Sequence, residues 1–239
     1  MFSSSRLFAA LLLTSASALV CAAPVTPTFT TFSNLAGATY GGSGIPTDPS
    51  AITTLNTLTL GLAAHQRLVG PNLGNDGAGT YFAPPGFGSG TASRWNFSYY
   101  VNDSAAALAQ TGLTFKILYD FDPGVNTDES QMGIFDLTSY LLNNSAASTI
   151  QDSQNLSFSF LSSAVLPFIT APAGTFDPNA QGQYSFALIA SNSTGEVARS
   201  AINVNVGEVA AAVPEPASVA LMGLGLAGVM LARRRKQSK

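Results

Sequence analysis

One short segment gathers most of the chemistry that the sequence offers in a single place. Residues 120–129 read Asp-Phe-Asp-Pro-Gly-Val-Asn-Thr-Asp-Glu, with four carboxylates and one amide among ten residues. Ca²⁺ takes about six to eight oxygen ligands, usually from carboxylates, amides and carbonyls of one flexible loop. The spacing does not follow the Asp-x-Asp-x-Asp-Gly pattern of an EF-hand. The candidate calcium ligands are Asp120, Asp122, Asn126, Asp128 and Glu129.

The same segment also has the composition of a solvated turn. Pro123-Gly124 favours a β-turn, and Asp side chains commonly accept hydrogen bonds from the backbone of such turns. We favour this second interpretation. Ca²⁺ is the one cofactor that the sequence suggests, and no other is expected.

Residues with the chemistry of a catalytic centre are scarce. His65 is the only histidine, and no Gly-x-Ser-x-Gly elbow supplies a serine nucleophile for it. His65 follows the end of an expected strand, so we expect a surface or strand-end role for it. Two carboxylates facing each other across a cleft could hydrolyse a glycosidic bond, but the many acidic residues single out no pair. We therefore assign no catalytic residue and do not expect an enzyme.

Short strands must position these side chains. Apolar and polar residues alternate with a period of two, which is the pattern of half-buried antiparallel strands. The acidic segment directly follows one of them, and a turn at Asn192-Ser193-Thr194-Gly195 joins the last two. About seven strands of this kind predict an all-β fold, a single antiparallel, jelly-roll-like β-sandwich. The expected strands are 28–32, 55–62, 94–101, 113–119, 156–160, 184–189 and 197–206.

Other segments carry weaker signals. Residues 104–110 could form one or two helical turns, 131–142 could be a strand or a short helix, and 70–90 is a Gly- and Pro-rich stretch expected to be a long loop. Trp95, Tyr99 and Tyr100 could stack on sugars if they were exposed. An alternating aromatic strand more commonly lies in a core, and we favour that interpretation.

Charge and cysteine content narrow the class of protein. Between about Pro24 and Glu208 the chain holds twelve acidic and four basic residues, so this body is strongly anionic. Nucleic-acid binding depends on phosphate neutralisation by Lys and Arg, so no nucleic-acid partner is expected. The single cysteine, Cys21, falls in the N-terminal leader, so neither a disulfide nor a zinc–thiolate site is expected in the body.

The N-terminus has the layout of a secretory signal peptide. Arg6 supplies the positive region, Leu7 to Val20 form the apolar region, and small residues follow at Cys21-Ala22-Ala23. We expect residues 1–23 to be removed during export through the secretion translocon. The body would then comprise residues 24–209.

The C-terminal segment, residues 210–239, contains three parts in a fixed order. Pro214-Glu215-Pro216 precedes an apolar stretch, Ala217 to Ala232, and four basic residues follow: Arg233, Arg234, Arg235 and Lys236. As a transmembrane helix the apolar stretch would span roughly 24 Å at about 1.5 Å per residue, slightly less than a hydrocarbon core of about 30 Å. The basic cluster is expected to act as a cytoplasmic stop.

This tail resembles the PEP-CTERM sorting signal of Gram-negative bacteria. The resemblance rests on Val213-Pro214-Glu215-Pro216-Ala217-Ser218, the Gly- and Leu-rich span and the basic cluster. It implies that exosortase, a membrane protease, cuts near Pro-Glu-Pro, and that the host makes extracellular polysaccharide. A permanent single-pass anchor is the alternative. A GPI signal normally ends in its apolar run, and the Leu-Pro-x-Thr-Gly motif of sortase substrates is absent from this tail.

Together these features predict an exported protein that passes through an inner-membrane-anchored intermediate to the cell surface or extracellular matrix. We expect a structural or adhesive role in exopolysaccharide or biofilm, with exopolysaccharide as a partner. A secreted polysaccharide-active enzyme and a Ca²⁺-dependent carbohydrate-binding module are the alternatives.

Overall fold

A computed structural model describes residues 24–47, 49–68, 72–125, 127–141, 145–163 and 165–207. The predicted signal peptide and the whole sorting tail lie outside these ranges. Within them, the helices are too short or too polar to cross a membrane. The division at residues 23 and 209 therefore stays a prediction.

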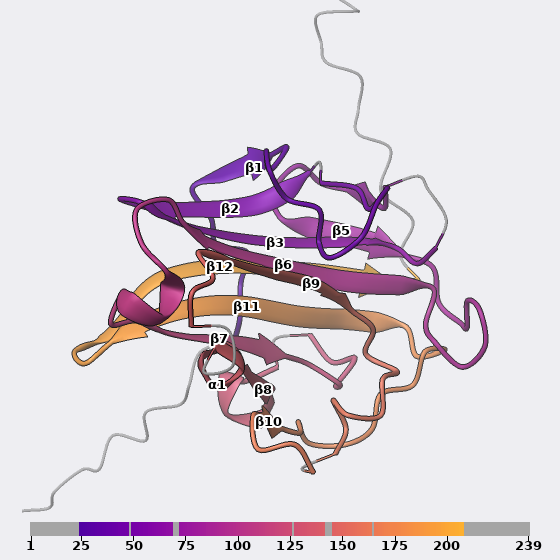
Figure 1. The fold of residues 1–239 in the computed structure, drawn as a ribbon. Coiled ribbons are helices and arrows are strands. Elements are labelled where there is room, and N and C mark those ends of the chain that lie inside the picture. Colours follow the sequence, from indigo (N-terminus) through magenta and orange to yellow (C-terminus); the bar gives the residue numbers. More distant parts are fainter. Residues whose placement is uncertain are drawn as a thin grey trace, which may run out of the picture.

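Strands dominate the described residues, and helix is confined to three short segments (Figure 1). The strands are β1 (Thr31–Ser33), β2 (Ser50–Leu55), β3 (Leu58–Gln66), β4 (Gly74–Asn75), β5 (Thr80–Ala83), β6 (Trp95–Asp103), β7 (Thr114–Tyr119), β8 (Gly133–Asp136), β9 (Thr149–Gln154), β10 (Ile169–Thr170), β11 (Gly182–Asn192) and β12 (Gly195–Val206). The helical segments are the 3₁₀ turns η1 (Leu108–Gln110) and η2 (Glu129–Gln131) and the helix α1 (Leu137–Leu141).

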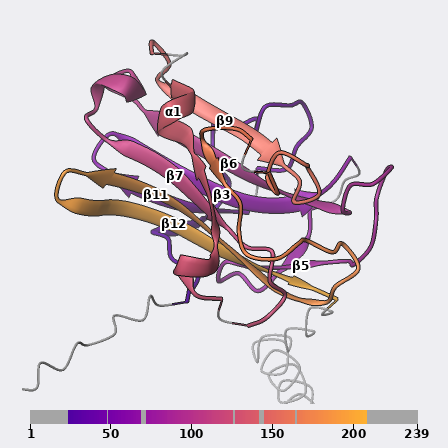
Figure 2. The same cartoon turned by 90° about the horizontal axis from the view of Figure 1, so that it is seen from below.

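The strands form two sheets that face each other, so the all-β prediction is confirmed (Figure 1). One sheet has the order β1-β2-β3-β6-β9, and the other has the order β10-β8-β7-β11-β12-β5-β4. Seen from below, β7, β11 and β12 run side by side as the centre of the larger sheet (Figure 2). Neighbouring strands are antiparallel except for β5 and β12, which pair in parallel. The jelly-roll-like connection order stays a prediction.

Aromatic side chains fill the space between the sheets. Alternate residues of β6 point inward, where Trp95 meets Phe186 of β11 edge-on at 6.0 Å between ring centroids and Phe97 stacks on the same ring at 4.7 Å. Both β6 rings are almost fully buried. The sugar-stacking alternative for this strand is therefore wrong for Trp95, and Tyr99 and Tyr100 are buried as well.

A loop covers the outer face of the five-stranded sheet. It joins β1 to β2, and the backbone N–H groups of Thr39 and Tyr40 both donate to Oε1 of Gln151 on β9, at 2.7 and 2.8 Å. The buried Tyr40 hydroxyl contacts Ser50 Oγ at 2.7 Å. Tyr40 has a positive φ of 49°, an uncommon conformation for a bulky residue. The loop thus holds Tyr40 in place by contacts on two strands.

Several strand predictions need correction. The segment 55–62 contains the β2–β3 hairpin, because Asn56 adopts a positive φ of 53° and reverses the chain after β2. Residues 156–160 form turns, with Phe158 N–H bonded to the Asn155 carbonyl, and the strand lies earlier, at β9. The expected loop 70–90 contains β4 and β5.

Candidate functional site

The loop over the five-stranded sheet lines an open cavity of about 450 Å³. A glycine-rich stretch, Gly41-Gly42-Ser43-Gly44, forms one wall. The ends of β3 and β9 and the start of β6 form the other walls. The polar side chains on those walls are His65, Gln66, Arg67, Asn96, Asp152 and Ser153. Among the described cavities, this one contains the sole histidine of the chain.

His65 is buried in this cavity wall, with only 3 % of its surface exposed. Its Nδ1 lies 3.0 Å from the Gln66 carbonyl, which can only accept a hydrogen bond, so Nδ1 carries the proton. Nε2 is then an acceptor with a single lone pair, and two hydroxyls lie within hydrogen-bond distance of it, Ser98 Oγ at 2.8 Å and Ser153 Oγ at 3.0 Å. Burial lowers the pKa of His65, so the ring stays neutral at pH 7.

Fixed amides orient the Ser153 hydroxyl. Asn96 Nδ2 donates to Ser153 Oγ at 2.9 Å. The buried Asn155 in turn donates to Asn96 Oδ1 at 2.7 Å, which determines which way the Asn96 amide faces. Serine, histidine and backbone carbonyl therefore form one connected chain of hydrogen bonds at the cavity wall.

Arg67 brings a positive charge to the same cavity. Its guanidinium carbon lies 5.4 Å from the centre of the Phe158 ring, a cation–π contact. Its Nε–H is buried and has no hydrogen-bond partner among the described residues. A buried donor without an acceptor is unfavourable, and this N–H is closed to solvent, so a molecule in the cavity does not reach it.

The sequence analysis allowed a surface or a strand-end role for His65. The strand-end role is confirmed, and the surface role is wrong because the ring is buried. The ring lies in the wall of a cavity that the β1–β2 loop also lines, and no local sequence pattern indicates this association of distant segments. The association with Ser153 was missed because 88 residues separate the two. Only the register of β3 with β6 and of β6 with β9 brings them to one face.

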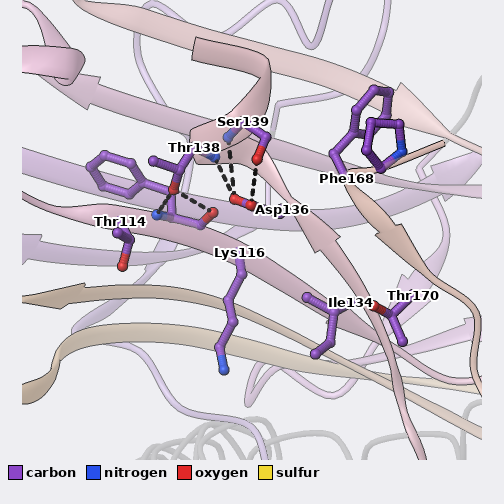
Figure 3. A pocket seen from close by; sticks show the side chains of 10 residues that line it. Thr114, Lys116, Ile134, Asp136, Thr138, Ser139, Phe168 and Thr170 are labelled. Atoms are coloured by element: carbon purple, nitrogen blue, oxygen red, sulfur yellow. Dashed lines mark hydrogen bonds between the residues drawn. The ribbon is translucent and has the colours of Figure 1, made fainter. Parts of the chain in front are cut away.

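A second cavity, of about 460 Å³, lies between β7, β8 and the segment before β10 (Figure 3). Asp136 accepts hydrogen bonds there from Thr138 N at 2.9 Å and from Ser139 Oγ at 2.6 Å. Its carboxylate therefore caps the start of α1. Lys116 extends away from this carboxylate (Figure 3). The polar groups of this cavity mainly stabilise local structure, so we regard the His65 cavity as the candidate site.

The carboxylates of the acidic segment do not converge on one point. Asp120, Asp122 and Asp128 each accept a hydrogen bond from a backbone N–H two residues later in the chain, all at 2.8 Å. Glu129 turns away to pair with Arg199 of β12 at 2.6 Å. Asn126 lies outside the described residues. Across the described part of the chain, acidic, histidine and cysteine side chains form no group of three that could hold a metal ion. This geometry favours the turn interpretation.

The calcium hypothesis, the less favoured of the two interpretations, has a direct test. If the ion binds the folded protein, millimolar CaCl₂ raises the melting temperature, since any ligand of the native state alone stabilises it. From the capped geometry of Asp120, Asp122 and Asp128 we expect no shift. Thermal melts with CaCl₂, MgCl₂ and EDTA make the comparison. A melting temperature that rises with CaCl₂ but not with MgCl₂ would support calcium binding and contradict our expectation.

Asp120 makes the stability of the fold depend on pH. Its carboxylate is almost fully buried, at 1 % exposure. Its Oδ2 has no hydrogen-bond partner among the described residues. Burial raises the pKa of Asp120 to about 6. The folded state therefore holds this proton more tightly than the unfolded chain does, and the free energy of unfolding falls as the pH rises from about 4 to 6.

Asp120→Asn is expected to remove that pH dependence. The variant should be more stable than the wild type at pH 7, by at most about 3 kcal/mol, since each pKa unit corresponds to about 1.4 kcal/mol. At pH 4 the two should be nearly equal. Urea denaturation at both pH values measures this, with exposed Asp177→Asn as the matched control. If the free energies of unfolding of Asp120→Asn and wild type differed by the same amount at pH 4 and pH 7, Asp120 would not be the source of the pH dependence.

Comparison with known protein families finds a PEP-CTERM protein-sorting motif at residues 212–236. This match includes Pro214, Glu215, Pro216 and the basic cluster Arg233 to Lys236, and it confirms the resemblance of the tail. It supports an exported protein that exosortase processes at a membrane-associated step. No curated protein and no solved structure matches the chain. What is said of residues 24–207 therefore depends on the structure of this chain and not on a relative.

Proposed function

We propose that this chain is a structural or adhesive component of the cell surface or extracellular matrix of a Gram-negative bacterium. The observation that carries the proposal is the PEP-CTERM motif at residues 212–236. A sorting signal of this kind gives the body a destination outside the cytoplasm. Exopolysaccharide or biofilm is the setting that we assign to it.

The body has properties that suit this setting. It contains no cysteine after residue 21, so its fold needs no particular redox environment. Burial of aromatic residues between two sheets supplies its stability. Its excess of acidic over basic residues keeps copies apart in solution. These properties support a durable extracellular domain.

The proposed route follows from the order of the segments. The signal peptide directs the chain to the translocon, and the apolar stretch 217–232 then anchors it in the inner membrane, with Arg233 to Lys236 on the cytoplasmic side. Exosortase cleaves near Pro214 and releases the body for its final location.

Fractionation of the host culture tests the matrix role. We expect the processed protein in the exopolysaccharide fraction of the wild-type host, and its release into the medium when polysaccharide synthesis is blocked. A processed protein that stays equally soluble in both cultures would contradict the matrix role while leaving the sorting step intact.

Of the two alternatives, an enzyme gains support from a specific observation, for ester chemistry and not for glycosidic bonds. That observation is the hydrogen-bonded pair of Ser153 and His65 on a cavity wall, not the pair of carboxylates expected from the sequence. The Ca²⁺-dependent binding module depends on the melting experiment described above.

A further inference from the structure

We propose that Ser153 is a nucleophile and His65 its general base, in a site that hydrolyses short-chain carboxylic esters of polar alcohols. This activity goes beyond the matrix role. It depends only on the geometry of the cavity beneath the β1–β2 loop, so it stands or falls independently of the sorting signal.

A nucleophile, a general base and a group that orients the base are linked by hydrogen bonds. Ser153 Oγ lies 3.0 Å from His65 Nε2, within the range for proton transfer in a nucleophile–base pair. His65 Nδ1 donates to the Gln66 carbonyl at 3.0 Å, so the backbone takes the orienting role that a carboxylate has in many such sites. The buried ring is neutral and can accept the serine proton.

Two serines, Ser153 and Ser98, contact His65 Nε2, and their exposure differs. Ser98 Oγ is closer to Nε2, at 2.8 Å, but Ser98 is fully buried and does not line the cavity. Ser153 is only half-buried and forms part of the cavity wall. A substrate can therefore reach Ser153 alone. Because Nε2 has one lone pair, the Ser98 hydroxyl weakens the activation of Ser153 whenever it donates to that atom.

The cavity lining determines the class of substrate. A volume of about 450 Å³ holds a small ester, and a lining of mainly glycine and polar residues offers little apolar surface for a long acyl chain. Arg67, whose guanidinium carries several N–H donors, lines the cavity, and the Asn96 amide has a second N–H besides the one that bonds Ser153 Oγ. These donors suit the oxygens of an ester and of a polar alcohol, while Asp152 on the same wall disfavours an anionic substrate.

The proposed reaction has two balanced steps. Ser153 Oγ attacks the ester carbonyl carbon while its proton passes to His65 Nε2. The bond to the alkoxy oxygen then breaks, and the departing alcohol takes that proton. Water next attacks the acyl-serine and gives a proton to His65, which returns it to Ser153 as the carboxylic acid leaves. The sum is ester plus water to acid plus alcohol, without any oxidant or metal.

A fluorophosphonate probe tests the nucleophile directly, since an activated serine displaces fluoride from phosphorus and keeps the phosphonyl group. We expect the full-length chain to be labelled on Ser153, as identified by peptide mass spectrometry, and heat-denatured protein to remain unlabelled. Ser153→Ala should abolish labelling. Ser98→Ala is the matched control at the same histidine and should be labelled at least as fast as the wild type, because the competing donor is gone.

Melting temperatures of the two variants show whether each is folded. Absence of label on Ser153 in the native wild type would overturn the proposal. So would equal labelling of folded Ser153→Ala, or loss of labelling in a folded Ser98→Ala. Labelling of Ser153 in the wild type and in Ser98→Ala, with none in Ser153→Ala, establishes the nucleophile.

Discussion

Alanine replacement of Pro214, Glu215 and Pro216 is expected to leave the protein uncleaved and retained in the inner membrane. These residues lie near the start of the sorting motif at 212–236, and the apolar stretch and basic cluster that follow remain intact. The variant therefore still inserts but is no longer recognised by the protease. Membrane fractionation and immunoblotting of the host should show a shift of nearly all of the protein to the full-length membrane form.

The last three residues of the chain provide the matched control. Alanine replacement of Gln237, Ser238 and Lys239 changes the same number of residues just outside the motif. This control should be processed as the wild type is. Normal processing of the Pro-Glu-Pro variant would show that the protease does not read these residues.

Trp95→Ala is expected to produce the largest loss of stability of any single substitution considered. Trp95 is 1 % exposed and contacts three rings, those of Phe176, Tyr184 and Phe186, at centroid distances of 6.3, 5.8 and 6.0 Å. Truncation of a buried Trp costs about 3–5 kcal/mol through lost burial and a residual cavity. That is a large fraction of a total that is commonly about 5–15 kcal/mol. Urea denaturation should show a correspondingly lower midpoint.

Phe87→Ala is the control for this substitution. Phe87 is an aromatic residue that is 47 % exposed, so its truncation should change the free energy of unfolding by less than about 0.5 kcal/mol. Similar losses for Trp95→Ala and Phe87→Ala would contradict the packing of β6 against β11.

The strands with strict alternation were the most predictable part of the fold. Residues 113–119 and 94–101 correspond to β7 and β6 within two residues at each end, and the turn 192–195 joins β11 to β12 as expected. In these segments each second side chain lies between the sheets, so the burial pattern is visible in the local sequence. The ambiguous segment 131–142 contains both expected elements, β8 followed by α1.

Elements that depend on distant partners were not predictable in this way. The apolar residues Phe158 and Phe160 alternate like a strand, yet they lie in turns after β9 and pack at the edge of the core. The parallel pair β5–β12 joins residues more than a hundred positions apart. Nothing in the Gly- and Pro-rich sequence around β5 signals that pairing.

The acidic segment and the Ser153–His65 pair also differ in how far the local sequence predicts them. The acidic segment was easy to find because its residues are neighbours in sequence, but in the structure its carboxylates hold their own turns and Glu129 pairs with Arg199. The Ser153–His65 pair was invisible because strand register, not sequence spacing, creates it. The sorting motif could be identified from the sequence alone, because its three parts follow one another along the chain.

The intact mass and C-terminal peptide of the protein recovered from its host, with and without exosortase, test the central claim most directly. We predict a mature C-terminus near Pro214 in the wild-type host and a chain ending at Lys239 in the deletion strain. A chain ending at Lys239 in both strains would contradict sorting, and the tail would then be a permanent membrane anchor.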